Sequence, residues 1–261
     1  MTDRGTELRI VSWNIHGAVR PDLDDLSTTL ASFDADAIGL QEVRRHQARR
    51  LSINLGYHCV WVFKHNGYSR FLPRFAEGLA ILSRWPMTHD GDTELGGPRS
   101  RSDFRRRVAA WATIEHPDGD FCFVDTHLAS GNDAEERVRQ ASDVHRLLRD
   151  GLIQDCHHDD HEHDDRREPP TLVVGDLNDH REPDVVNALA GDLLRDAWVI
   201  APGRSRSGLT NPASAPHQRL DHVLIPREWS VSRVEVPDPD DAWSRRSDHL
   251  PVIVTVQIRS K

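Results

Sequence analysis

Short runs of apolar residues, separated by polar segments, recur along almost the whole chain. Runs of this length that are rich in β-branched residues predict buried strands. They lie at residues 8–14, 37–42, 58–63, 78–83, 107–116, 120–128, 171–176, 219–225, 230–236 and 250–258. The letters PDG, which separate the fifth run from the sixth, predict a hairpin turn.

Three further segments have the pattern of helices, at residues 22–33, 44–55 and 132–150. The last of them is amphipathic, because its apolar residues recur at helical spacing along one face. Strands therefore dominate, helices lie between them, and no break is long enough to be an interdomain linker. We expect a single α/β domain over residues 1–261, built from two layers of sheet that are covered by helices.

Residues 155–170 stand out because four histidines lie there among seven acidic residues. One interpretation is a tract that catches a divalent transition metal, since imidazole and carboxylate groups suit such ions. The other is a solvated surface insertion without fixed geometry, which the composition favours. We therefore assign no catalytic role to this segment.

The chain has 261 residues, 37% of them hydrophobic, and a formal net charge of -9. Its three cysteines are too few and too scattered for a disulfide framework or a thiolate metal site. No apolar run approaches the ~20 residues that span a bilayer, and the N-terminus lacks the pattern of a signal peptide. We expect a soluble, cytoplasmic monomer without integral membrane association.

The acidic balance also restricts the substrate, because proteins that hold duplex DNA through many phosphate contacts normally carry a basic surface. An anionic substrate must therefore be bound locally. Only two of the 33 basic residues are lysines, Lys64 and Lys261. Nearly all the positive charge is thus arginine, which grips phosphate oxygens in a planar fork.

Polar residues follow or precede six of the apolar runs. They are Asn14 and His16, Glu42, Asp125 and His127, Asp176 and Asn178, Asp221 and His222, and Asp248 and His249. Strand ends in α/β folds present side chains to a cleft, which suits catalytic groups. The set offers carboxylates for a hard divalent cation, histidines for proton transfer and amides for an oxyanion. This combination suits metal-assisted phosphoryl transfer to water.

Seven short sequence motifs are distributed along almost the whole chain: SWNIHG at 12–17, LQEV at 40–43, EGLAILSRWP at 77–86, DTHL at 125–128, GDLND at 175–179, RLDHVL at 219–224 and SDHLPV at 247–252. This ordered set resembles the endonuclease/exonuclease/phosphatase superfamily, which includes DNase-I-like nucleases. The resemblance implies a four-layer αββα sandwich of two mostly antiparallel β-sheets flanked by helices. His16 and Asp125 depart from the AP-endonuclease pattern, so the chain is more similar to the small bacterial members.

The resemblance also implies a metal site. Glu42 would be the principal Mg²⁺ ligand, with Mn²⁺ or Ca²⁺ as substitute ions, and Asn14 and Asp248 would complete or support the site. The structural alternative for Glu42 is a cap on the helix that follows it. The number of metal ions stays open at this point.

The same resemblance assigns the groups that handle protons and the phosphate. His249 would contact the phosphate and transfer a proton, while Asp221 accepts its other N–H and fixes its tautomer. Asp176 would orient or deprotonate the attacking water, and Asn178 would hold a phosphoryl oxygen. His127 would donate a hydrogen bond to the phosphate or a proton to the leaving oxygen. Which of Asp176 and His249 is the general base stays open.

Substrate binding beyond the scissile group is assigned to residues 98–107, a probable loop with five arginines that include Arg105 and Arg107. A loop that balances nearby acids is the alternative. The leading hypothesis is a Mg²⁺-dependent phosphodiesterase that acts on DNA or RNA by in-line attack of water. The first alternative is a phosphatase or phosphodiesterase of small or lipid-derived phosphates, and the second is a non-catalytic metal-binding protein.

Overall fold

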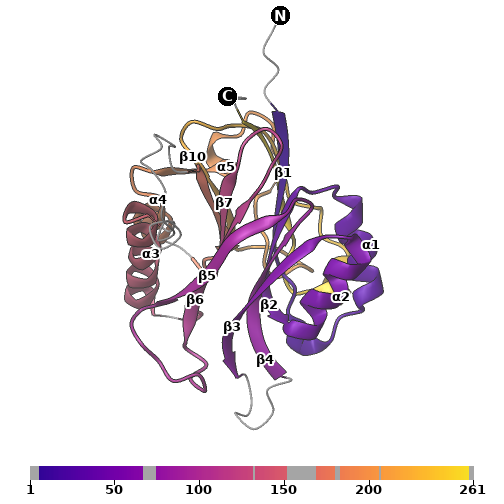
Figure 1. Ribbon diagram of the computed structural model, residues 1–261. Helices are drawn as coiled ribbons and strands as arrows, with labels where there is room; N and C mark the ends of the chain where they lie inside the picture. Colours follow the sequence, from indigo (N-terminus) through magenta and orange to yellow (C-terminus); the bar gives the residue numbers. More distant parts are fainter. Residues whose placement is uncertain are drawn as a thin grey trace, which may run out of the picture.

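Two six-stranded sheets form the centre of the molecule, and helices cover their outer faces (Figure 1). The structure is a computed structural model that describes residues 6–66, 75–131, 133–151, 169–179, 183–205 and 207–258. Sheet A has the strand order β11-β12-β1-β2-β4-β3 and sheet B the order β5-β6-β7-β8-β10-β9. Each sheet contains one parallel pair, β1 with β2 and β7 with β8, among antiparallel pairs. The predicted αββα sandwich is therefore confirmed.

The strands of sheet A are β1 (Thr6–Asn14), β2 (Ala37–Arg44), β3 (His58–Asn66), β4 (Ala76–Ser83), β11 (Ser230–Glu235) and β12 (Val252–Ile258). Those of sheet B are β5 (Met87–Leu95), β6 (Arg107–Ile114), β7 (Phe121–His127), β8 (Thr171–Asp176), β9 (Leu194–Asp196) and β10 (Asp221–Pro226). The helices are α1 (Leu23–Ser32), α2 (Arg45–Leu55), α3 (Ala134–Arg149), α4 (Pro183–Ala190), α5 (Ala197–Ile200) and α6 (Asp241–Arg246).

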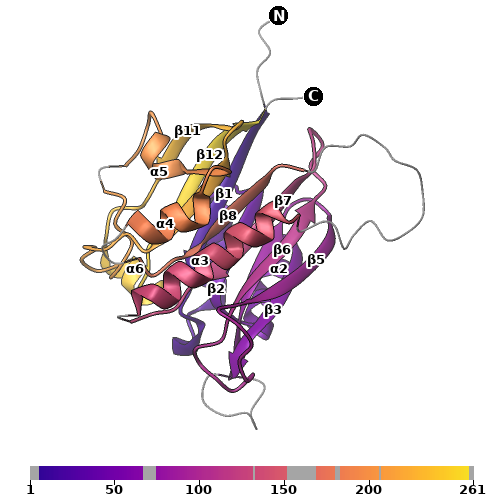
Figure 2. The ribbon, with the colours of Figure 1, turned by 90° about the vertical axis from the view of Figure 1, so that its left-hand side faces the viewer.

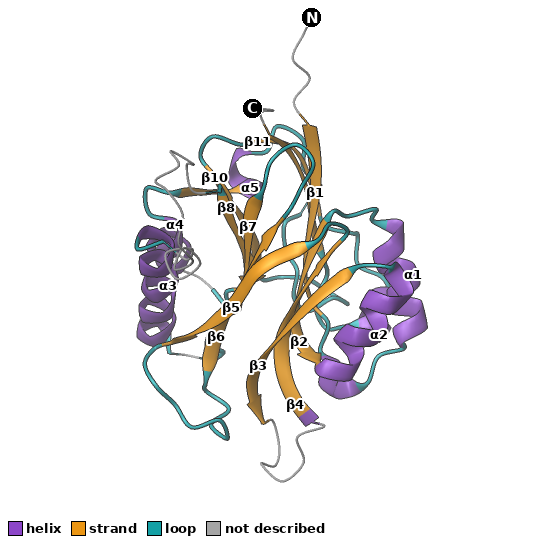
Figure 3. Ribbon diagram, in the orientation of Figure 1, coloured by secondary structure: helices purple, strands orange, loops and turns teal. Residues whose placement is uncertain are grey.

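The apolar residues form three layers. Side chains such as Leu8 of β1 and Phe123 of β7 pack between the two sheets. A second cluster joins α1 and α2 to the outer face of sheet A, and a third joins α3 and α4 to sheet B. Figure 2 shows α3 and α4 crossing the outer face of sheet B, and Figure 3 shows the helices outside and the strands inside. Every central strand is thus buried on both faces.

Local sequence sets where the helices begin and end. The carboxylate of Asp22 accepts hydrogen bonds from the backbone N–H groups of Asp24 and Asp25 and so caps α1. Asp133 caps α3 in the same way. Gly56 ends α2 in the left-handed conformation, with φ of 70°. The three helices predicted from periodicity are therefore confirmed, with bounds that differ by one or two residues.

Six elements were not predicted from the sequence: the short 3-10 helix η1 (Gly17–Val19), β5, α4, β9, α5 and α6. β5 lies at the edge of sheet B, and most of its side chains are exposed or half-buried, so its letters MTHDGDTEL carry no apolar run. The His-rich segment falls mainly outside the described residues, since 155–168 are not among them. Of the helices that are described, none is long and apolar enough to cross a membrane.

Candidate active site

Strand alternation directs the predicted site residues into the space between the sheets. Phe123 of β7 faces the opposite sheet, so His127, four residues further on, faces it too. Val174 of β8 also faces the opposite sheet, and so does Asp176, two residues further on. Asp221 of β10 shares this orientation with Val223. β1 and β2 are parallel neighbours in sheet A, and β7 and β8 are parallel neighbours in sheet B. The carboxyl ends of the strands in each pair therefore lie side by side. The predicted residues therefore converge at one end of the two sheets.

Asp176 lies at the centre of the group and is 1% exposed. Its Oδ2 accepts a hydrogen bond from Nδ2 of Asn14 at 3.0 Å, and its Oδ1 accepts one from the backbone N–H of Asn178. The Nε2 atoms of His127 and His249 lie 3.6 Å and 3.8 Å from Oδ2. Burial raises the pKa of Asp176, although His249 opposes this shift. The geometry and the raised pKa suit a carboxylate that accepts a proton.

His249 forms the tightest pair of the site, because its Nδ1 lies 2.8 Å from Oδ2 of the buried Asp221. The loop that carries it is tied to β1, where Trp13 donates its indole N–H to the His249 carbonyl and Ser247 donates its hydroxyl to the Asn14 carbonyl. Burial alone would lower the pKa of His249, but the carboxylates of Asp221 and Asp176 outweigh it and raise the pKa to about 10. The metal-free protein therefore carries an imidazolium here at neutral pH.

This imidazolium predicts a pH-dependent stability. A histidine whose pKa rises from 6.5 to about 10 on folding stabilises the protein fully below pH 6.5, and the contribution is lost as the pH rises through about 10. We expect the urea midpoint of the EDTA-treated protein to fall over this window. The same midpoint should fall much less in His249→Gln. Equal pH dependence in the two proteins would show that His249 is not charged in the folded state.

Glu42 reaches the site through a β-bulge. The register of β2 against β4 shifts between Leu40 and Val43, and Glu42 has a φ of 54°, which is rare for a residue with a side chain. Simple alternation would turn Glu42 toward the helices with Leu40. Instead its Oε1 lies 3.9 Å from Nδ1 of His127, and the side chain is 23% exposed. The strained backbone thus holds an accessible carboxylate at the mouth of the site.

The donor set fits a hard divalent cation. Four carboxylates, those of Glu42, Asp176, Asp221 and Asp248, gather around His127 and His249, and Oδ1 of the buried Asp221 has no hydrogen-bond partner. Carboxylate oxygens are the ligands that Mg²⁺ prefers. The tightest group of potential ligand atoms is Asp176, Asp221 and His249, within 4.8 Å of one another. This group differs from the set predicted from the sequence, which was Glu42, Asn14 and Asp248.

The predicted ligands Glu42 and Asp248 are more accessible than Asp221 and His249, which already engage each other. The Nδ1 of His249 cannot bind a cation while it shares a proton with Asp221. Glu42 and Asp248 remain accessible, and Asp248 lies 3.3 Å from Nδ1 of His16. Asn14 turns its Nδ2 toward Asp176 and its Oδ1 toward the backbone N–H of His16, so it can join the two parts of the site.

Asp125, by contrast, lies behind the site. It is fully buried between the sheets, where its Oδ1 accepts a hydrogen bond from Nε2 of Gln41 at 2.7 Å. Burial raises its pKa well above the usual range. This contact joins β2 of sheet A to β7 of sheet B. Asp125 is therefore a structural link rather than a group at the mouth.

The residues assigned to substrate binding occupy different environments. Asn178 lies next to Asp176 and donates one amide hydrogen to the Leu128 carbonyl, which leaves the second hydrogen available. Arg107 is 5% exposed and donates to the carbonyls of Phe104 and Arg106. The side chain of Arg105 is 63% exposed and pairs with Asp103. The structure thus brings Asn178 to the centre, buries Arg107 beside it and leaves Arg105 on the surface.

Two residues that sequence reasoning missed lie next to His127. Lys64 is 1% exposed, and its Nζ lies 3.2 Å from Nδ1 of His127 and 2.5 Å from Oε1 of Glu77. Burial opposes ionisation of Glu77, but the Lys64 ammonium and His65 lower its pKa below the ordinary value. The signal in the sequence was slight. Lys64 is one of only two lysines, and it follows an apolar strand.

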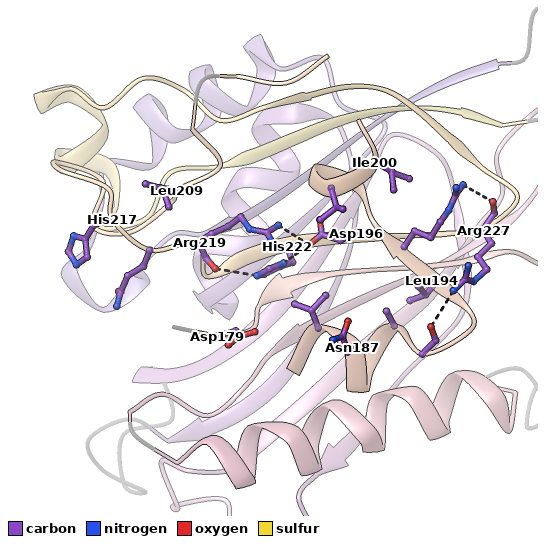
Figure 4. A pocket seen from close by; sticks show the side chains of 16 residues that line it. Asp179, Asn187, Leu194, Asp196, Ile200, Leu209, His217, Arg219, His222 and Arg227 are labelled. Atoms are coloured by element: carbon purple, nitrogen blue, oxygen red, sulfur yellow. Dashed lines mark hydrogen bonds and ion pairs between the residues drawn. The ribbon is translucent and has the colours of Figure 1, made fainter. Parts of the chain in front are cut away.

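His222 points away from the site, although it is the neighbour of Asp221. It faces the helix side of sheet B, where its Nδ1 lies 3.1 Å from Oδ2 of Asp196. The guanidinium of Arg219 donates a hydrogen bond to the same oxygen at 2.7 Å. These side chains line a cavity of about 600 Å³ near α4, β9 and α5 (Figure 4). Its arginines bond largely to protein groups, as the dashed lines of Figure 4 show. This cavity is therefore separate from the candidate site between the sheets.

The chain is similar to known proteins in its sequence and in its fold. A sequence profile of the Endonuclease/Exonuclease/phosphatase family matches residues 11–249. No curated protein sequence matches the chain. Among solved structures, a family protein from Leptotrichia buccalis is similar with 18% identity and a TM-score of 0.76, covering 96% of this chain and 100% of that chain.

Two other similar structures are of proteins whose names describe an activity or a catalytic domain. A mannosyl-6-phosphatase from Bacteroides thetaiotaomicron has 20% identity and a TM-score of 0.73, covering 96% of this chain and 100% of its own. The human Nocturnin catalytic domain with a bound sulfate has 21% identity and a TM-score of 0.69, covering 96% and 93%. At these identities the likenesses show a shared fold.

Proposed function

We propose, from the premise that this chain belongs to the endonuclease/exonuclease/phosphatase family, that it is a Mg²⁺-dependent phosphodiesterase. Members of this family are phosphoester hydrolases that generally depend on a divalent metal. One observation carries the proposal for this chain. The buried Asp176 lies within 4 Å of two histidines whose other ring nitrogens contact Lys64 and Asp221.

The residues divide into a metal-holding part and a proton-transfer part. Glu42, with Asn14 and Asp248, would hold the cation. When bound, the cation would neutralise phosphoryl charge and polarise a phosphoryl oxygen. The protein residues position the phosphate and the water around it. This division follows from the fact that Asp221 and His249 are already hydrogen-bonded to each other.

We assign Asp176 as the group that accepts the proton of the attacking water. Its raised pKa matches this task, and Asn14 and Asn178 fix its orientation. His249 is the cationic donor, because two carboxylates keep it protonated. The N–H groups of His127 and His249 face the same carboxylate and can donate to the phosphate, while one of them returns a proton to the leaving oxygen.

Nucleic acid is the substrate class that we place first. Phe104 is 65% exposed, and the exposed Arg101 and Arg105 lie near it in the sequence. An aromatic ring flanked by guanidinium groups suits a base and its phosphates. The segment leads into β6, which begins at Arg107 beside the His127 end of β7. A bound strand could therefore extend from the catalytic end over residues 101–105.

A second candidate, a small or lipid-derived phosphoester, is favoured by a different observation. Most of the arginines in residues 98–107 are already engaged: Arg99 pairs with Glu136, Arg105 with Asp103 and Arg106 with Glu94. The net charge of -9 would also repel an extended polyanion. A compact substrate needs few contacts outside the catalytic end.

Salt dependence distinguishes the two candidates. If three phosphate contacts hold a single strand, raising NaCl from about 50 to about 200 mM should lower kcat/KM for an oligonucleotide about 20-fold. The rate for bis-p-nitrophenyl phosphate should change little over the same range. Phe104→Ala should raise KM for the oligonucleotide and leave the small substrate unaffected. A flat salt profile with the oligonucleotide, or activity on small or lipid phosphates alone, would favour the second candidate.

A further inference from the structure

Lys64 reaches the active site because it lies two residues after Val62, on the face of β3 that packs between the sheets. Phe63 pairs with Gly78 of β4 and His65 pairs with Glu77, so Lys64 is the extra residue between two registered pairs. This bulge places the next residue, His65, opposite Glu77. The guanidinium of Arg106 fixes the bulge by donating to the carbonyls of Phe63 and Lys64. The ammonium of Lys64 is thereby held between sheet A and sheet B.

The contacts of Lys64 determine which nitrogen of His127 carries the proton. An ammonium group donates hydrogen bonds and cannot accept them. Its Nζ lies 3.2 Å from Nδ1 of His127, so this nitrogen must be the acceptor. The proton of the neutral ring then sits on Nε2, which lies 3.6 Å from Oδ2 of Asp176. The ring thus presents a donor to the catalytic centre.

A competing contact would give the opposite tautomer. Oε1 of Glu42 lies 3.9 Å from the same Nδ1 atom, and a carboxylate favours a protonated nitrogen. Lys64 is closer, and Glu77 compensates its buried charge at 2.5 Å. Without the ammonium, the carboxylates of Glu42 and Glu77 would be the negative charges near the ring. The choice of tautomer therefore depends on Lys64.

We propose that Lys64 is a positioning residue that holds His127 as its Nε2–H tautomer, so that the ring donates to the substrate phosphate. Donation to the substrate phosphate rests on the proposed function, whereas the tautomer is a property of the resting protein. Glu77 serves the same arrangement by holding the ammonium in place. Neither residue needs to touch the substrate.

Nitrogen NMR of the metal-free protein tests the tautomer directly. In ¹⁵N-histidine-labelled protein, with the His127 signals assigned through His127→Gln, we expect Nε2 to be protonated and Nδ1 to be unprotonated. Lys64→Met should move the ring toward the Nδ1–H form, and Lys64→Arg should keep the original form because guanidinium also only donates. An Nδ1–H ring or an imidazolium in the wild type would overturn the proposal, as would an unchanged tautomer in Lys64→Met.

Two further variants complete the test. Lys64→Met leaves the buried Glu77 carboxylate without its ammonium partner, which can unfold the protein, so Lys64→Met/Glu77→Gln removes both charges together. It should show the same change of tautomer. His65→Gln is the matched control, because His65 lies 3.4 Å from Glu77 in the same bulge and makes no described contact with His127. A tautomer change in His65→Gln as large as in Lys64→Met would contradict a specific role for Lys64.

The kinetic consequence is a second readout. On any substrate that the wild type hydrolyses, Lys64→Met should lower kcat by about 10- to 100-fold with little change in KM, the range for a partner that orients a functional group. Lys64→Arg should restore most of the rate. If the wild type hydrolyses no phosphoester, the proposed function fails while the NMR result stands. If it is active but kcat is unaffected in Lys64→Met, the positioning role alone fails.

Discussion

Replacing His249 by alanine should lower kcat for phosphoester hydrolysis by about 10³-fold, a typical loss for a group that transfers or donates a proton in the transition state. The imidazolium is held 2.8 Å from Asp221, and its free Nε2 faces Asp176 across 3.8 Å. Its main-chain bonds to Trp13 and Ser247 do not involve the ring, so the loop should keep its place in the variant. KM should change much less than kcat.

β10, the strand that carries Asp221, provides a matched control for this variant. His222 is as buried as His249, and its Nδ1 also pairs with an aspartate, but it faces the helix side of sheet B. His222→Ala should keep kcat within about twofold of the wild type, in contrast to the loss expected for a proton-transfer group. Steady-state kinetics and circular dichroism of both variants provide the comparison. Equal losses in the two variants would mean that His249 acts through stability alone.

The second large effect is expected at Glu42. Glu42→Gln keeps the size of the side chain but removes its charge, and it should raise the Mg²⁺ concentration for half-maximal activity by at least about 10-fold. The reason is that Glu42 is the accessible carboxylate that the bulge of β2 holds at the mouth of the site. Isothermal titration with Mg²⁺ should show the same loss of affinity without any substrate.

Glu7→Gln is the control for Glu42→Gln, because Glu7 lies near the opposite end of β1 and contacts Gln257. Its Mg²⁺ titration should match that of the wild type. If Glu42→Gln also binds Mg²⁺ as tightly as the wild type, the cation is held elsewhere. The group of Asp176, Asp221 and His249 would then be the next site to test.

The central strands could be predicted because their apolar runs are buried on both faces and end in polar residues. β1 shows this clearly, with Leu8 and Ile10 between the sheets and Asn14 at the end of the same face. β5 could not be predicted in this way, since an edge strand can keep polar side chains in solvent. The short helices α5 and α6, of four and six residues, are too brief for periodicity to reveal them.

The site was predictable where alternation decides which way a side chain points, and less so where a bulge decides it. Asp176, Asp221 and Lys64 follow the alternation of their strands, whereas Glu42 depends on a register shift that the sequence does not show. Arg105 and Arg107 both lie in the arginine-rich segment 98–107. The strand predicted at 107–116 already separates them, and the fold shows the consequence, because β6 begins at Arg107 and buries it while Arg105 stays in the preceding loop.

The central claim is metal-dependent hydrolysis at Asp176, and one measurement tests it most directly. Phosphate or nucleotide release should be measured for wild type and Asp176→Asn, with EDTA or with added Mg²⁺ or Mn²⁺. The substrates are plasmid DNA, single-stranded DNA, RNA, bis-p-nitrophenyl phosphate, and inositol and lipid phosphates. We predict release by the wild type that requires the metal and falls by about 10²-fold or more in Asp176→Asn. Release that survives EDTA, release at the wild-type rate in Asp176→Asn, or no release from any substrate would contradict the claim.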